Sequence, residues 1–220
     1  MKRKVKESKE ELRKRARTIV RLLRKRYPGA TTALRFTAPH ELLVATVLSA
    51  QSTDKKVNEI TETLFRKYRS PADFARARTR TLEKEIKATG FFRSKARSIM
   101  SLSKDLVEKH SGRVPDNLED LVALRGVGRK TANVVLAGAF GKPGIVVDTH
   151  MIRIANRLGL TKNKDPVKIE FDLMDIVSKK VWGEFSFMIV LHGREICNAR
   201  KPLCHICVIE KHCPSSNLRS

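Results

Sequence analysis

The chain has 220 residues, 41% of them hydrophobic, which is enough for a folded protein with one sizeable core or two modest ones. Its 46 Lys and Arg against 23 Asp and Glu leave a formal net charge of +23, which indicates a polyanionic partner. No apolar run approaches the roughly 18 residues of a membrane span. We therefore expect a nucleic-acid-binding protein with no membrane partner.

The N-terminal segment is the most basic part of the chain, with 13 Lys or Arg and three Glu in residues 2–26. So many charges exclude the apolar core of a signal peptide, and we expect an intracellular protein, in the cytoplasm or nucleoid if bacterial. Helical spacing of apolar residues predicts an amphipathic helix over residues 9–26, with Leu12, Ala16, Ile19, Val20 and Leu23 on one face. Its basic outer face is either a DNA contact or a solvated surface.

The next helices are separated by turn residues. After Tyr27-Pro28-Gly29, a helix is predicted from near Pro39 to Leu48. The polar turn 49–54 precedes an amphipathic helix for which Asp54 is a candidate N-cap. Short helices are expected near residues 71–77 and 80–88.

A glycine break at Gly90 is followed by Phe91 and Phe92, and then by a predicted helix over residues 93–110. Further helices are predicted over 117–124, 131–140, 149–158, 165–180 and 184–195. Residues 145–147 have an extended character but are too few to establish a sheet. With no convincing strand pairing, the predicted fold class is all-α.

The segment 124–133 reads Leu-Arg-Gly-Val-Gly-Arg-Lys-Thr-Ala-Asn, a glycine hinge between two predicted helices. Gly126 and Gly128 have no Cβ, so the backbone can turn sharply and bring its N–H groups close to another molecule. Because the following helix begins here, its positive end favours a phosphate. Lys130 lies in the first turn of that helix. Its position alone predicts a surface lysine that binds phosphate.

Four cysteines lie within 17 residues near the C-terminus, at Cys197, Cys204, Cys207 and Cys213, and none lies elsewhere. Two nested disulfides are possible by count, but no secretion signal supports them. Structural zinc prefers two close cysteine pairs, and here only Cys204 and Cys207 form one. The spacing therefore favours a [4Fe–4S] cluster, with zinc as the alternative.

The sequence closely resembles the endonuclease III family of DNA repair enzymes over nearly its whole length. The motifs that carry the resemblance are residues 48–54 (Leu-Ser-Ala-Gln-Ser-Thr-Asp), 90–96, the hairpin 126–133, Val-Asp-Thr-His at 147–150, and the cysteine loop. A glycine hairpin alone would indicate only a DNA-binding element, and four cysteines alone only a metal. Their conjunction in this order is highly specific.

The resemblance implies two helical domains with a substrate cleft between them. One is a six-helix barrel with a helix-hairpin-helix motif over residues 32–142, and the other combines residues 1–31 and 143–220 with the cluster loop. The implied activity is base excision repair by a bifunctional DNA N-glycosylase that removes oxidised pyrimidines and cleaves the abasic site by β-elimination. Double-stranded DNA with damaged bases or abasic sites is the implied partner, and the protein is expected to be a monomer.

The resemblance implies that Lys130 is the nucleophile, because an amine can attack the anomeric carbon and form a Schiff base. The helix start and the surrounding basic charge disfavour its ammonium form. Asp148 is implied to assist the attack and to stabilise the positive charge on the sugar. It also precedes a helix and is a good N-cap, and both roles are compatible. His150 is implied to contact a phosphate, against the plain alternative of an exposed helix residue.

The target base must leave the stack before a lysine can reach its sugar, and the gap must be filled. Gln51 and Phe91 match the two DNA-inserting positions of the family. For Phe91 the alternative is a core residue, with Phe92 as the exposed ring. Arg200 and Lys201 are implied to point from the cluster loop toward phosphates, the cluster itself being structural.

Arg125 departs from the family, which usually has proline before Gly-Val-Gly. Loss of proline makes the turn less rigid, while a guanidinium can contact phosphate. Related adenine glycosylases lack the hairpin lysine, and related 8-oxoguanine glycosylases lack the cysteine loop. The remaining alternatives are an enzyme that is mainly an abasic-site lyase and a non-catalytic DNA-binding iron–sulfur protein.

Overall fold

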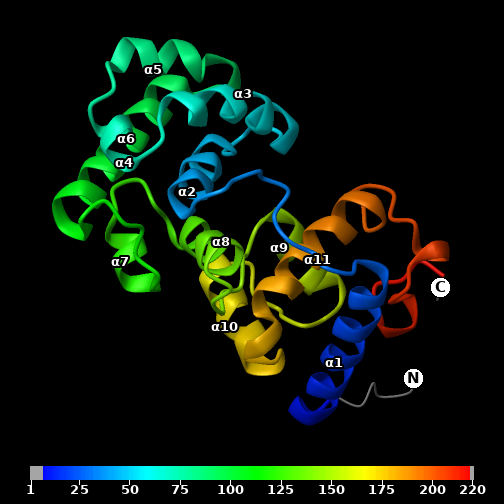
Figure 1. Ribbon diagram of the computed structural model, residues 1–220. Helices are drawn as coiled ribbons and strands as arrows, with labels where there is room; N and C mark the ends of the chain where they lie inside the picture. The colour runs from blue at the N-terminus through cyan, green and yellow to red at the C-terminus, as the bar shows by residue number, and fades with distance from the viewer. Residues whose placement is uncertain (1–6, 219–220) are drawn as a thin grey trace. The chain divides into compact units, whose positions relative to one another are not determined.

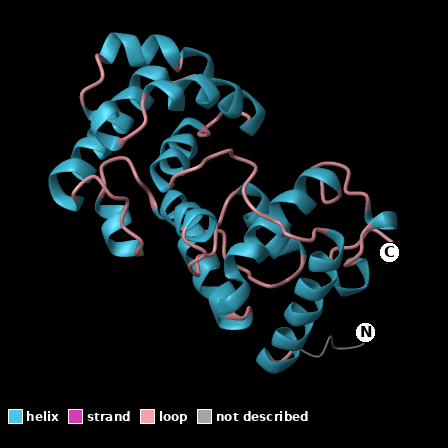
Figure 2. Ribbon diagram, in the orientation of Figure 1, coloured by secondary structure: helices cyan, strands magenta, loops and turns pink. Residues whose placement is uncertain are grey.

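The computed structural model describes residues 7–218. Within this range all regular elements are helices and no strand is present (Figures 1 and 2), which confirms the predicted all-α class. The chain divides into two compact units: Thr32–Lys142 forms one, and Met1–Thr31 with Pro143–Ser220 forms the other. No helix in the described range is both long and apolar enough to cross a membrane.

The central unit, Thr32–Lys142, is built around two helices, α2 and α6, that bury most of their apolar residues. In α2, Leu42, Leu43 and Leu48 are fully buried, and α6 buries Ile99 and Leu102 to the same extent. α2 packs against α8, and α4 packs against α6. The elements of this unit are α2 (Pro39–Leu48), α3 (Asp54–Lys67), α4 (Pro71–Ala75), α5 (Thr79–Glu85), the 3₁₀ helix η1 (Lys87–Thr89), α6 (Phe92–His110), α7 (Leu118–Ala123) and α8 (Arg129–Ala139).

The second unit joins the N-terminal helix to the C-terminal third of the chain. Its elements are α1 (Lys9–Arg26), α9 (Thr149–Arg157), α10 (Pro166–Ile176), η2 (Lys179–Val181), α11 (Trp182–Glu195), η3 (Cys204–Ile206) and η4 (Glu210–His212). The predicted apolar face of α1 is confirmed, because Ala16, Ile19, Val20 and Leu23 are buried. This face packs against α10 and α11, and α9 also packs against α11.

Two local predictions are wrong. Thr53, and not Asp54, is the N-cap of α3, and its side chain accepts a hydrogen bond from the Lys56 N–H at 3.2 Å. Asp54 is the first helical residue, where a negative charge also favours the helix start. The helix predicted over 165–180 ends at Ile176, because Val177 is extended and its carbonyl accepts a hydrogen bond from the Trp182 indole at 2.9 Å.

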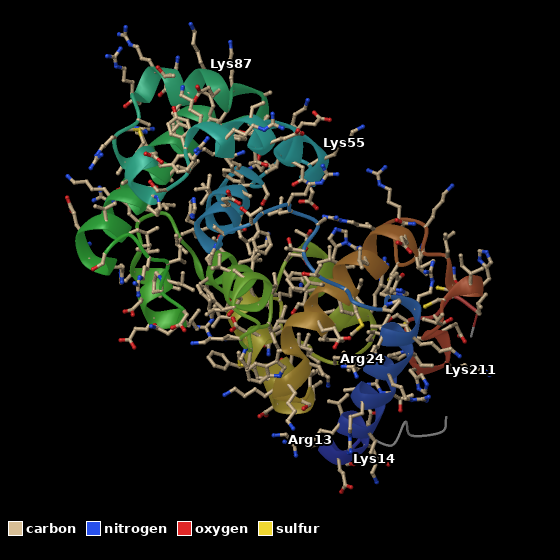
Figure 3. All side chains as sticks on the ribbon, in the orientation of Figure 1. Arg13, Lys14, Arg24, Lys55, Lys87 and Lys211 are labelled. Carbon is tan, nitrogen blue, oxygen red and sulfur yellow. The ribbon has the colours of Figure 1, made fainter. Side chains whose placement is uncertain are left out.

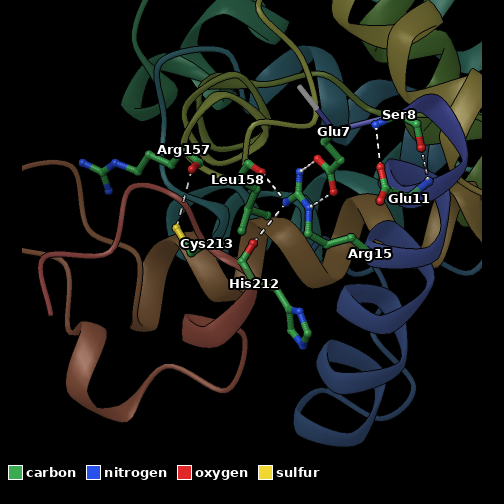
Figure 4. A network of polar contacts seen from close by, with 8 residues as sticks. All are labelled: Glu7, Ser8, Glu11, Arg15, Arg157, Leu158, His212 and Cys213. Atoms are coloured by element: carbon green, nitrogen blue, oxygen red, sulfur yellow. Dashed lines mark hydrogen bonds and ion pairs between the residues drawn. The ribbon is translucent and has the colours of Figure 1, made fainter. Parts of the chain in front are cut away.

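Arg15 on α1 connects three segments of the second unit (Figure 4). Its guanidinium donates to both carboxylate oxygens of Glu7, at 2.8 and 2.7 Å. Its Nη1 donates to the carbonyls of Leu158 at 2.6 Å and His212 at 3.0 Å. Leu158 is the C-cap of α9 and His212 lies in the cysteine loop. One cation therefore donates hydrogen bonds both to a carbonyl at the C-terminus of a helix and to a carbonyl of the loop.

Basic side chains cover the surface of both units. Lys55 and Lys87 project from the central unit, while Arg13, Lys14 and Lys211 project from the other (Figure 3). Some of this charge is neutralised locally, because Lys14 pairs with Glu10 at 3.2 Å. The remaining excess is consistent with a polyanionic partner.

Candidate active site

The hairpin before α8 is a tight turn that starts at Leu124. The Val127 N–H donates to the Leu124 carbonyl at 3.0 Å, and Gly126 has a φ of +84°. A four-residue turn with positive φ at its third residue is a type II turn, which requires glycine there. Leu124 and Val127 are both buried, so the turn is held by the core on either side of the exposed glycine.

The two glycines of the hairpin occupy their positions for different structural reasons. A Cβ on Gly126 would lie 3.0 Å from both Cβ and Oγ of Ser98, in addition to the strain of its positive φ. A Cβ on Gly128 would meet nothing within 4 Å, and the φ of Gly128 is an ordinary −89°. Gly128 is the N-cap of α8 without a side-chain cap, so a substituent there would extend into the space in front of the helix start. Gly126 therefore serves the turn, and Gly128 leaves the helix start open.

Arg125 stands at the second position of this turn, where proline is favoured. Unlike proline, it has an N–H, and that N–H donates to the Asp105 carboxylate at 3.2 Å. Asp105 is held in turn by Lys109 at 2.6 Å. The hydrogen bond from Lys109, supported by the one from Arg125, lowers the pKa of Asp105. The departure from proline is thus compensated by a tie between the hairpin and α6.

Lys130 lies in the first turn of α8, two residues after the N-cap. Its side chain is exposed, and no hydrogen bond or ion pair to another described residue holds it. Lys142, which follows the other end of α8, is different because it pairs with Asp116. Lys130 is therefore an available amine at the positive end of a helix.

Asp148 is the N-cap of α9 and its Oδ1 accepts a hydrogen bond from the Met151 N–H at 2.8 Å. The capping role expected from the sequence is confirmed. The segment that precedes it, residues 145–147, lies outside any helix and is buried, and the Val146 N–H donates to Ser186 Oγ at 2.9 Å. The backbone of Asp148 is therefore fixed from both sides, while its half-buried side chain keeps a second oxygen.

His150, in the first turn of α9, is half-buried and lies against the backbone of Gly193, where a Cβ would come within 2.4 Å of its Nδ1. Its Nδ1 lies 3.1 Å from Nη2 of Arg153. Burial lowers the pKa of His150. The ring thus lies between Arg153 and Gly193, and the alternative of an exposed helix residue is wrong.

Gln51 and Phe91 are two of the three non-glycine residues with positive φ in the described range, at 54° and 48°. Both side chains are exposed, and that of Phe91 is 65% accessible. Phe92 is half-buried, so the alternative in which Phe91 lies in the core and Phe92 is the exposed ring is wrong. Such conformations are uncommon and are often found at functional positions.

The four cysteines line one cavity in the second unit, together with apolar side chains that include Ile154, Leu158 and Pro202. Burial, with the neighbouring cysteines, raises the pKa of the Cys207 thiol to about 11, so thiolates here need a cationic centre to neutralise them. Four sulfur donors around one apolar-walled cavity fit an iron–sulfur group.

Two arginines on α9 hold the start of the cysteine loop. Arg153 donates to the carbonyls of Gly193 and Cys197. Arg157 donates to the carbonyls of Asn198 and Ala199, each at 2.7 Å. Arg157 Nη1 also lies 3.3 Å from Cys197 Sγ. The helix capped by Asp148 is therefore the helix that supports the loop.

The next two residues of this loop, Arg200 and Lys201, are exposed and make no hydrogen bond or ion pair with the rest of residues 7–218. Sequence reasoning did not single out Arg153 and Arg157, the two arginines that hold the start of this loop. Their four-residue spacing on one helix is the only signal that could have suggested them. Asp105 and the buried Lys95 were also missed.

The structure thus combines an all-helical fold, a glycine hairpin with an available lysine, and a loop of four clustered cysteines. A glycine hairpin between two helices in an all-helical fold places this chain in the class of helix-hairpin-helix proteins. The model of the HhH-GPD superfamily base excision DNA repair proteins matches residues 44–179.

Relatives match along nearly the entire chain. Endonuclease III of Synechocystis sp. is 48% identical over 93% of this chain and 94% of its own length, and that of Escherichia coli is 42% identical over 89% and 92%. A solved endonuclease III trapped as a covalent intermediate with DNA is 39% identical, with a TM-score of 0.88 over 94% of this chain and 98% of its own. A thermostable thymine-DNA glycosylase, 24% identical with a TM-score of 0.83, shares the fold.

This chain belongs to the HhH-GPD superfamily of base excision DNA repair proteins. It is a DNA glycosylase with abasic-site lyase activity, which makes it an enzyme and disfavours the non-catalytic alternative. Iron–sulfur binding fits both the family and the cysteine cavity.

Proposed function

We propose that Lys130 and Asp148 carry out the chemistry of this enzyme on oxidised pyrimidines in double-stranded DNA. The observation that carries the proposal is Lys130 itself, an exposed amine at the start of α8 with no polar partner among residues 7–218, directly after the glycine hairpin. The covalent DNA intermediate of the related endonuclease III supports a covalent mechanism of this kind.

In the proposed reaction the Lys130 amine attacks C1′ of the damaged nucleotide, the bond from C1′ to the base breaks, and the amine gives up a proton. The C1′–O4′ bond then breaks and O4′ takes a proton, which opens the sugar ring and leaves a Schiff base between C1′ and Lys130. The Schiff base makes the C2′ proton acidic, and loss of this proton breaks the C3′–O bond to the phosphate by β-elimination. Asp148 assists the attack and stabilises the positive charge on the sugar through the carboxylate oxygen that does not cap α9. Each residue lies at the start of a helix, where its backbone is well fixed.

DNA is proposed to bind through backbone groups and cations. Gly126 and Gly128 bring the hairpin N–H groups to a phosphate, and a ring N–H of His150 donates to another. Arg200 and Lys201 add charge from the cysteine loop. The exposed side chains that fill the gap left by the extruded base are Gln51 and Phe91.

The cysteine loop is proposed to hold a [4Fe–4S] cluster through Cys197, Cys204, Cys207 and Cys213. The cluster would cross-link a loop that has little core of its own. We further propose that Thr32–Lys142 is the six-helix barrel domain and the other unit the iron–sulfur domain, in an intracellular monomer.

Borohydride trapping tests the nucleophile. Wild-type protein should become covalently attached to duplex DNA that contains an oxidised pyrimidine, and Lys130→Ala should not. Lys55→Ala, which removes an exposed lysine in the same unit, is the matched control and should be trapped like wild type. Equal trapping of Lys130→Ala would refute the assignment.

A lesion panel tests the substrate class. Oxidised pyrimidines should be released faster than oxidised purines or mismatched bases, with base release and strand cleavage scored separately. Strand cleavage at abasic sites without measurable base release would instead identify the enzyme as mainly a lyase.

A further inference from the structure

Lys95 is a buried cation in the central unit, with only 5% of its surface accessible. Its Nζ donates to two backbone carbonyls, those of Leu48 and Thr89, each at 2.8 Å. No carboxylate within residues 7–218 forms an ion pair with it. The lysine therefore binds backbone alone.

This arrangement is unfavourable for the lysine by itself. Lysine is almost never fully buried without a partner of opposite charge, and burial lowers the pKa of Lys95. It also lies in the first turn of α6, the end of a helix that disfavours a cation. A core position of this kind would be filled at lower cost by an apolar side chain.

The two carbonyls explain the position. Leu48 is the last residue of α2 and Thr89 is the last residue of η1, so the ammonium binds the negative ends of two helical segments. The Lys95 N–H also donates to the Phe91 carbonyl at 3.0 Å. One residue thus holds the ends of two loops that are 41 positions apart in the chain (Leu48 to Thr89).

These loops carry Gln51, three residues after Leu48, and Phe91, two residues after Thr89. Both residues adopt the left-handed backbone conformation, with φ values of 54° and 48°. That conformation is unfavourable for a non-glycine residue and persists only where the surroundings impose it. The Lys95 contacts immediately precede both strained turns.

We propose that Lys95 is a positioning residue that fixes the spacing between Gln51 and Phe91, so that both enter the DNA gap together. The inference rests on the proposed function, in which these two side chains replace the extruded nucleotide. Lys95 touches neither DNA nor the reacting atoms, and it acts through the two turns that it ties.

The test is a double-mutant cycle that reads base release from lesion-containing duplex in single turnovers. Lys95→Met keeps an unbranched side chain but removes the donors, and it should slow base release by about tenfold or more. In a Gln51→Ala/Phe91→Ala background the same change should alter the rate by less than about twofold, because the residues that it positions are gone. Trapping on a single-stranded abasic oligonucleotide, which has no gap to fill, should stay within about twofold of wild type.

A spectroscopic readout follows the placement directly. With 2-aminopurine opposite an uncleavable abasic analogue, wild-type protein should change the fluorescence as the gap is filled. Lys95→Met should reduce that change at saturating protein. Lys95→Gln, whose shorter side chain keeps N–H donors but cannot reach both carbonyls, enters the same cycle and decides the question should the methionine variant not fold.

An equal loss of rate in both backgrounds would overturn the proposal, because it would mean that Lys95 supports the fold in general. Wild-type rates for Lys95→Met would also overturn it. If Gln51→Ala/Phe91→Ala itself released the base as fast as wild type, the proposed roles of those two residues would fail first. That outcome is distinguishable because it does not involve Lys95.

Discussion

The hairpin 124–133 and the cysteine loop 197–213 are both short segments without regular strands, yet they are stabilised in different ways. The hairpin is stabilised mainly by residues of its own segment. The Val127 N–H donates to the Leu124 carbonyl, glycine occupies the position with positive φ, and Leu124 and Val127 are buried. The cysteine loop contains only two 3₁₀ turns, and arginines from α1 and α9 hold its carbonyls.

The difference shows how each segment keeps its shape. The hairpin has little freedom once the adjacent helices form. The loop has almost no core of its own, with Ile209 as its one fully buried apolar residue in the described range, and we therefore expect it to depend on cations and on the proposed cluster. We expect mutations to separate the two segments.

Loss of a cysteine ligand should have the largest effect. Cys204→Ser should abolish iron incorporation and the associated visible colour, and it should lower the free energy of unfolding of the second unit by about 4 kcal/mol or more. Iron analysis and hydrogen exchange by mass spectrometry measure both. Amides of the loop should lose protection, while those of Leu124–Asn133 should keep it. Colourless wild-type protein that contains zinc would contradict the cluster.

Arg15→Met should destabilise the same unit by about 2–3 kcal/mol, because the carbonyls of Leu158 and His212 lose their shared donor. Thermal denaturation measures the change. Arg17→Met is the matched control: this neighbour on α1 is exposed, and its loss should cost less than about 0.5 kcal/mol. Similar losses in the two variants would show that the loop does not depend on this contact.

The two hairpin glycines should respond differently. Gly126→Ala should lower the free energy of unfolding by about 1–3 kcal/mol, because of its φ of +84° and its contact with Ser98. Gly128→Ala should cost at most about 1 kcal/mol but weaken binding to duplex DNA, since its Cβ points into open space before α8. Melting and DNA titration at constant salt distinguish the effects. Equal melting temperatures of the Gly126→Ala and Gly128→Ala variants would contradict the separate structural roles of the two glycines.

Arg125→Pro should have the smallest effect, within about 1 kcal/mol. It removes the N–H bond to Asp105 but restricts the unfolded chain, and these changes oppose each other. Because the pKa of Asp105 is lowered, the contribution of this carboxylate is present above its ordinary value and is lost as the pH falls through the lowered one. In acid the balance should therefore shift toward the proline variant, which keeps the advantage of its restricted unfolded chain. A difference in stability that does not change with pH would exclude Asp105.

The sequence by itself determined the helices, the class and the candidate chemistry. Periodicity and caps are local properties, so α1 and the first turn of α8 could be placed from neighbouring residues. The four cysteines lie within 17 residues, so their proximity in space is nearly guaranteed by chain length. Gly126 meets a conformational requirement, a positive φ, that a glycine in the sequence indicates directly.

Only the tertiary structure decided which polar groups support these sites. The bond between Arg125 and Asp105, the two carbonyls bound by Lys95 and the three segments joined by Arg15 all connect residues that are far apart in the chain. It also decided that Phe91, in the left-handed backbone region, is exposed while Phe92 is half-buried. Such pairings depend on packing between helices, which no local pattern encodes.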